Sequence, residues 1–146
     1  MGTAITKRFE SACPVVGNTK VFRVPRIDLG TATTDQRVPM PWKCLLIAVD
    51  VWSGKTWLQD AISGTRVTVE KDIAGGTSLF QGSVTDGSAT GSKTSLTKQS
   101  STKSDYLIDN GYINLELSPS ITGASANISG SISVDLVMEM GDTIEY

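Results

Sequence analysis

Apolar and polar residues alternate along the last extended segment of the chain, from Ile128 to Met140. One face of this segment is made of apolar residues and one glycine, namely Ile128, Gly130, Ile132, Val134, Leu136, Met138 and Met140. The other face carries serine, aspartate and glutamate, and Val137 is its one apolar member. A side-chain period of two predicts a strand with one buried face. The C-terminal part of the chain is therefore expected to contribute a half-buried strand to the core.

Similar extended segments recur along the chain, separated by turn-forming residues. Besides the last segment, strands are expected over residues 21–29, 43–52, 66–70, 78–81, 106–108 and 112–117. The segment 43–52 is nearly all apolar, so both of its faces are expected to be covered at least in part. Its residues Ile47 and Val49 are expected to face, or to lie beside, the apolar residues of the last strand. Residues 57–62 are the one stretch that favours a short helical turn.

Three other segments are expected to be turns or loops. Residues 82–104 form a polar run rich in serine, threonine and glycine, which favours a long loop or an exposed hairpin. Asn110-Gly111 favours a tight turn between two strands, because both residues tolerate positive φ angles. Residues 119–127 are expected to form another loop. Seven or eight strands with little helix predict an all-β, single-domain β-sandwich of jelly-roll type.

The first residues differ from the rest of the chain. Residues 1–18 lack a steady period, although they contain apolar residues such as Phe9. They are expected to form an N-terminal arm or an irregular edge strand, and residues 19–146 are expected to form the β-sandwich domain. No apolar run follows Lys7 and Arg8, so neither a secretory signal nor a membrane span is expected. Cys13 and Cys44 are expected to be buried thiols in a reducing compartment, with a disulfide between them as the alternative.

The composition of the chain disfavours several classes of function. The chain has 146 residues, a net charge of -2 and no histidine. Histidine is the commonest general base and the commonest ligand for zinc, so its absence disfavours an enzyme and a metal centre. No basic face is large enough to favour nucleic-acid binding. We expect no catalytic residues, no cofactor and no metal.

Three motifs of the chain have both a functional and a structural interpretation. Ser53-Gly-Lys-Thr56 resembles the end of a phosphate-binding loop, but Val49 stands where that loop needs its first glycine. Glu70 and Glu116 are two strand carboxylates of the kind a glycosidase uses, but outward-facing surface carboxylates are the favoured interpretation. The aspartates lack the spacing of a calcium loop, and a calcium site assembled from separate loops stays an open alternative.

The tryptophans Trp42, Trp52 and Trp57 lie close together in the sequence. Tryptophan buries a large area, so packing in the core or at an interface is the favoured role. Aromatic rings at an interface concentrate binding energy, which makes these three residues and Phe9 the interface candidates. The alternative is that exposed rings stack on sugars, as in a carbohydrate-binding module or a fibre domain used in host-surface recognition.

The order of these segments is similar to that of a known class of viral proteins. An extended opening (20–24), an apolar strand (44–51), a Thr-Val-rich strand (65–70), a polar loop, a strand after Asp-Asn-Gly (112–117) and a long alternating last strand follow one another. Over residues 20–140 this resembles the small, jelly-roll-like β-sandwich proteins that tailed bacteriophages place on the virion, of the head decoration or cement type.

That resemblance implies a non-enzymatic capsid decoration protein, which would bind the outer surface of the phage head and stabilise it. The implied partner is the major capsid protein, and the implied location is the virion, after synthesis in the host cytoplasm. We expect a homo-oligomer, with a trimer slightly ahead of a dimer, and no nucleic-acid or membrane partner. Carbohydrate binding remains the alternative function, with a glycan as the ligand.

Overall fold

The computed structural model describes residues 19–30, 32–58, 62–85, 92–121 and 129–140. Nearly all of these residues belong to strands. The elements are β1 (Thr19–Asp28), β2 (Thr34–Leu58), β3 (Ile62–Lys71), β4 (Ser78–Thr85), β5 (Lys93–Ser95), β6 (Thr97–Lys98), the 3-10 helix η2 (Lys103–Tyr106), β7 (Leu107–Ile121) and β8 (Ser129–Met140). No helix among the described residues has the length and apolar character needed to cross a membrane.

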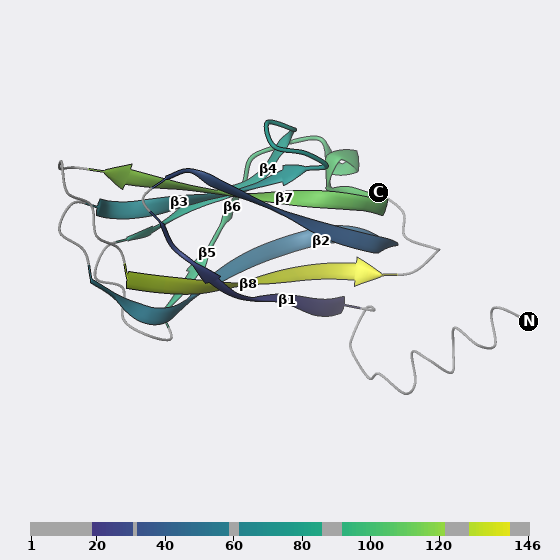
Figure 1. The fold of residues 1–146 in the computed structure, drawn as a ribbon. Helices are drawn as coiled ribbons and strands as arrows, with labels where there is room; N and C mark the ends of the chain where they lie inside the picture. The colour runs from purple at the N-terminus through teal and green to yellow at the C-terminus, as the bar shows by residue number, and fades with distance from the viewer. Residues whose placement is uncertain (1–18, 31, 59–61, 86–91, 122–128, 141–146) are drawn as a thin grey trace, which may run out of the picture.

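The strands form one curled antiparallel sheet in the order β1-β8-β2-β7-β3-β4-β6, and β5 pairs with β2 beside this path. The curl folds the sheet onto itself. Figure 1 shows β3, β4 and β7 above β8 and β1. The predicted class, an all-β single domain compatible with a β-sandwich or jelly-roll-like fold, is confirmed.

Strand β2 joins the two halves of the sheet. Its residues 34–45 pair with β7, and its residues 44–58 pair with β8. Cys44 and Leu45 pair with both neighbours. Pro39 and Pro41 lie in the first part, where β7 is the one pairing neighbour among the described strands. A proline removes a backbone donor and is tolerated at such an edge, which explains how these prolines fit a strand of 25 residues.

The core lies between the two halves of the curled sheet, and the last strand supplies its centre. Ile132, Val134, Leu136 and Met138 are each 0% exposed, as the alternating pattern predicts. Val49 is also fully buried and lies directly opposite Leu136. Ile47 falls in a register shift between Leu46 and Ala48 and is half-buried. The predicted arrangement of this part of the core is therefore confirmed.

The tight turn expected at Asn110-Gly111 is wrong, because β7 runs through it as one strand. Asn110 does adopt a positive φ of 50°, but a two-residue hairpin turn of the expected type needs positive φ at both positions, and Gly111 lacks it. On the paired strand, the register shifts between Met40 and Lys43. Asn110 thus lies opposite two residues of β2, Pro41 and Trp42, and the ladder contains a bulge whose extra residue is on β2.

Two further expectations need correction. The helical turn expected over residues 57–62 is wrong for the residues of this segment that the structure describes. Trp57 and Leu58 are the last residues of strand β2, and Ile62 is the first residue of strand β3. The polar run 82–104 is not all loop, since residues 82–85 continue β4 and the short strands β5 and β6 follow. A polar segment can form these strands because the ladder hydrogen bonds join backbone groups and need no apolar side chains. Gly82 fits its position because it has no side chain: a Cβ there would lie 2.7 Å from a methyl group of Leu96.

The loop expected from residue 119 onward also begins later, because β7 continues to Ile121. Strand β1 starts at Thr19, two residues before the expected segment. The predicted arm over residues 1–18 lies outside the described residues.

Candidate functional site

Trp42 lies in the bulge of β2, beside β1 and β8. Its ring centre is 5.6 Å from that of Phe22, with the two planes tilted by 59°. Its indole N–H donates to the sulfur of Met138, 3.4 Å away. The ring is half-buried and packs against the core. Trp42 therefore anchors the start of β1 to the rest of the sheet while part of its ring faces solvent.

Strand β1 ends the strand order of the sheet, so no other described strand pairs with its outer edge. Val21 is 60% exposed and Phe22 is 36% exposed at the start of this strand. The second half of β1 is less suited to pairing with another strand. Its register against β8 shifts between Val24 and Ile27, around Pro25, and such an irregularity at a sheet edge discourages further pairing. Val21 and Phe22 project from opposite faces of β1 and so flank its outer edge on both sides, and Trp42 packs against Phe22. We call Val21, Phe22 and Trp42 the β1 edge surface. It combines apolar side chains with a strand edge that no described strand pairs with, which is the feature that other chains recognise.

Trp52 lies ten residues further along β2, on the outer face of the sheet. Its indole N–H donates to Asp135 Oδ2 over 2.9 Å. The guanidinium of Arg23 on β1 holds the same carboxylate with two hydrogen bonds, Nε to Oδ1 at 2.7 Å and Nη2 to Oδ2 at 2.9 Å. These hydrogen bonds from Arg23 lower the pKa of Asp135, opposed by its burial and assisted by the charge of Arg23 and by Trp52. Asp135 is therefore held as a carboxylate across three neighbouring strands.

The short strand β5 adds further polar groups beside Trp52. It pairs with β2 in a register that places Lys93 opposite Trp52 and Ser95 opposite Asp50. The Lys93 ammonium lies 5.8 Å from the centre of the Trp52 ring. Ser95 donates its hydroxyl to Asp50 Oδ1 over 2.8 Å. We call this set the Trp52 patch, and its members are Arg23, Asp50, Trp52, Lys93, Ser95 and Asp135.

A second polar cluster lies on the outer face of the other half of the sheet. Oxygens of Asp35, Glu70 and Glu116, from β2, β3 and β7, all lie within 4.8 Å of one another. The amide of Asn114 donates to Asp35 over 2.8 Å and to Glu70 over 3.0 Å. The backbone N–H of Gly75 donates to the other oxygen of Glu70 over 2.7 Å. Carboxylate oxygens are the ligands that hard cations prefer. Here strands bring them together, whereas the alternative left open from the sequence was a calcium site assembled from separate loops.

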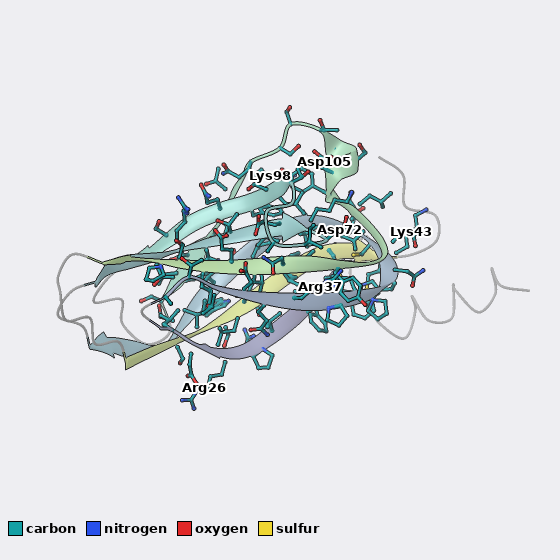
Figure 2. All side chains as sticks on the ribbon, turned by 45° about the horizontal axis from the view of Figure 1, so that its top comes forward. Arg26, Arg37, Lys43, Asp72, Lys98 and Asp105 are labelled. Atoms are coloured by element: carbon teal, nitrogen blue, oxygen red, sulfur yellow. The ribbon has the colours of Figure 1, made fainter. Side chains whose placement is uncertain are left out.

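The turn over residues 72–77 closes this cluster from outside. Arg37 donates to the carbonyl of Asp72 over 3.2 Å, and its guanidinium lies 3.9 Å from the centre of the Tyr112 ring. Figure 2 shows Arg37 and Asp72 close together at this end of the sheet. Glu70 is 5% exposed, and both of its oxygens accept hydrogen bonds. Glu70 and Glu116 come close as a pair of carboxylates, but Glu70 is closed to a substrate.

The structure separates the interface candidates that the sequence singled out. Trp42 contacts Met138 on the buried face of β8, whereas Trp52 contacts Asp135 on the opposite face. Trp57 lies near the end of β2, and its side chain is not among those described. Phe9 lies outside the described residues. Sequence reasoning did not single out Val21 and Phe22, which the structure leaves exposed on β1, although an apolar pair between Lys20 and Arg23 was a signal for them.

Cys44 is a free, buried thiol beneath Trp42. Burial raises the pKa of this thiol to about 11, and hydrogen bonding with Trp42 opposes the shift. The thiol is therefore protonated at neutral pH and serves as a small apolar core residue. Its potential partner, Cys13, lies outside the described residues.

Comparisons with known proteins show little similarity. No family model matches the chain, and no curated protein matches it significantly. Among solved structures, a chain from the structure of infectious bursal disease virus, Gx strain, is similar over 86% of this chain, with 11% sequence identity and a TM-score of 0.38. This chain spans 33% of that one. The comparisons thus give a weak structural likeness to a viral protein, on which we base no functional argument.

Proposed function

We propose that this chain is a non-enzymatic structural protein of a virion, and more specifically a capsid decoration protein that binds the outer surface of a phage head. The observation that carries this proposal is the β1 edge surface. Val21, at 60% exposure, and Phe22, which packs on Trp42, lie on a strand whose outer edge pairs with no described strand. Such a surface is suited to binding a protein, because it offers apolar anchors and backbone hydrogen-bonding groups together.

The mechanism is stabilisation by added buried surface. Each copy would contact two or more neighbouring copies of the major capsid protein and would hold these subunits together. Because the contact exists in the assembled shell alone, binding stabilises that shell by mass action. Such a role needs no cofactor, and places the protein on the virion after synthesis in the host cytoplasm. A homo-oligomer, a trimer before a dimer, would multiply the contacts made by each bound particle.

Co-sedimentation with empty capsids of the same virus tests the proposal. The substitution Val21→Glu places a charge on the β1 edge surface, and we expect it to weaken capsid binding by at least about tenfold. Ile73→Glu is the matched control, because Ile73 is 57% exposed on the turn between β3 and β4. This control should bind as the unmodified protein does. Equal binding by all three proteins, or no binding by any of them, would contradict the proposal.

A further inference from the structure

We propose that the Trp52 patch is a binding site for a neutral glycan built of hexopyranose rings. The site goes beyond the proposed capsid attachment, which uses the β1 edge surface. The two surfaces meet at Arg23 and differ in character, because the β1 edge surface is apolar and the Trp52 patch is one aromatic ring in a polar surround.

The first argument is the fixed position of the ring. Trp52 lies directly opposite Ser133, but its N–H reaches Asp135, two residues further along β8. The ring therefore leans diagonally across β8, over a position with a small side chain. Arg23 holds Asp135 from the far side, so the carboxylate that orients the ring is itself fixed. A platform that is already ordered before binding loses little conformational entropy when a ligand stacks on it.

The second argument is the supply of hydrogen-bonding groups around the ring. A sugar hydroxyl both donates and accepts, so a glycan site needs donors and acceptors beside an aromatic face. Asp50 accepts from Ser95 through one oxygen, and no described residue donates to its second oxygen, which can accept from a sugar hydroxyl. The Lys93 ammonium is exposed, and Arg23 carries further N–H groups beyond those that hold Asp135. Strand β5 brings two of these groups to Trp52 by pairing with three residues of β2.

The third argument is the balance of charge. The patch contains two cations, Arg23 and Lys93, and two carboxylates, Asp50 and Asp135. These charges compensate each other, so the patch favours neither polyanions nor polycations. A protein partner fits less well, because protein interfaces have an apolar centre and Trp52 is the one apolar side chain of this patch. A neutral, hydroxyl-rich ligand with one apolar ring face fits all three features.

A glycan array followed by NMR titration tests the proposal. The array carries neutral hexose oligosaccharides and acidic ones, and the full chain is the probe. We expect binding to at least one neutral glycan, with a Kd below about 5 mM and a shift of the Trp52 indole resonance. Trp52→Ala should weaken binding by at least about tenfold. The control Tyr112→Ala removes another exposed aromatic beside an arginine, on the other half of the sheet, and should leave the affinity unchanged.

Two further variants keep the test independent of folding defects. Lys93→Gln and Asp50→Asn change exposed or half-exposed polar groups without removing the ring, and each should lower the affinity by about threefold or more. Binding to no neutral glycan on the array would overturn the proposal. So would preference for acidic glycans, or full affinity in the Trp52→Ala variant. None of these results bears on capsid binding, which is tested at Val21.

Discussion

Truncating Leu136 to alanine tests whether the alternating face of β8 is the centre of the core. Leu136 is fully buried, with Phe22 of β1 opposite it on one side and Val49 of β2 on the other. Strands on both sides hold the backbone in place, so the neighbouring residues have little freedom to collapse into the space. The cost of the substitution should therefore include most of a cavity term.

The magnitude follows from the atoms removed. Leucine loses three methylene-sized groups, at about 0.8 kcal/mol each, or about 2.4 kcal/mol of transfer free energy in total. Substitutions of buried leucine by alanine cost about 2–5 kcal/mol once the residual cavity is included. We expect the free energy of unfolding to fall by about 3–4 kcal/mol. For a urea slope near 2 kcal/mol/M, the unfolding midpoint should fall by about 1.5–2 M.

Urea unfolding followed by circular dichroism measures this loss, and the neighbouring residue provides the control. Val137 faces the other side of the sheet and is half-buried. Val137→Ala should cost less than about 1 kcal/mol. A slip of the register by one residue would exchange the two faces of the strand. The reasoning is refuted if Leu136→Ala costs less than about 0.5 kcal/mol, or if Val137→Ala costs as much as Leu136→Ala.

Three other predictions concern a thiol, a carboxylate and the N-terminal segment. Burial raises the pKa of Cys44 from 9.0 to about 11. In a Cys13→Ser variant, Cys44 should therefore react with a disulfide reagent at pH 8 about a hundredfold more slowly in the folded protein than in urea. Equal rates in the two conditions would contradict this. Because Arg23 lowers the pKa of Asp135, its stabilisation is present above the ordinary pKa and is lost as pH falls through the folded value. The stability advantage over Asp135→Asn, measured by urea unfolding, should therefore shrink below about pH 4, and a constant difference down to pH 2.5 would refute it. Deletion of residues 1–17 should leave a folded sheet by circular dichroism but weaken capsid binding in sedimentation; unfolding would assign the segment to the core, and unchanged binding would remove it from the interface.

The pattern of apolar and polar residues along the sequence predicted which faces of single strands are buried. The face that contains Leu136 and Met138 was predictable because burial of one face imposes a period of two on the sequence. The neighbourhood of Val49 was predictable because a nearly all-apolar segment must lie in the centre of a sheet. Both predictions needed no knowledge of which strands pair.

Features that depend on pairing were not predictable in this way. Asn110-Gly111 is a strong local signal for a hairpin, but β2 continues alongside it, and Asn110 adopts its positive φ within β7, opposite a bulge in β2. The length of β2 was missed for a related reason. Its prolines favour an extended segment over residues 38–42, but its polar end after residue 52 looks like a break. Both parts belong to one strand because that strand changes partners along its length.

The candidate sites were predictable only as single residues. Trp52 was a candidate from the sequence, but its partners Arg23 and Asp135 are 29 residues before it and 83 residues after it. The register of β1, β8 and β2 brings them together. The carboxylates of Asp35 and Glu116 meet for the same reason, as opposite residues of β2 and β7.

Hydrogen exchange of β1, measured in the free protein and in a mixture with empty capsids, tests the central claim most directly. The amides of residues 19–24 lie on the edge strand that we propose to be the attachment site, and those of β5 lie beside the Trp52 patch. Capsids should slow exchange in residues 19–24 and leave β5 unchanged, because contact with a shell buries the β1 edge surface and its backbone. Unchanged exchange throughout β1 in the presence of saturating capsids would contradict the account.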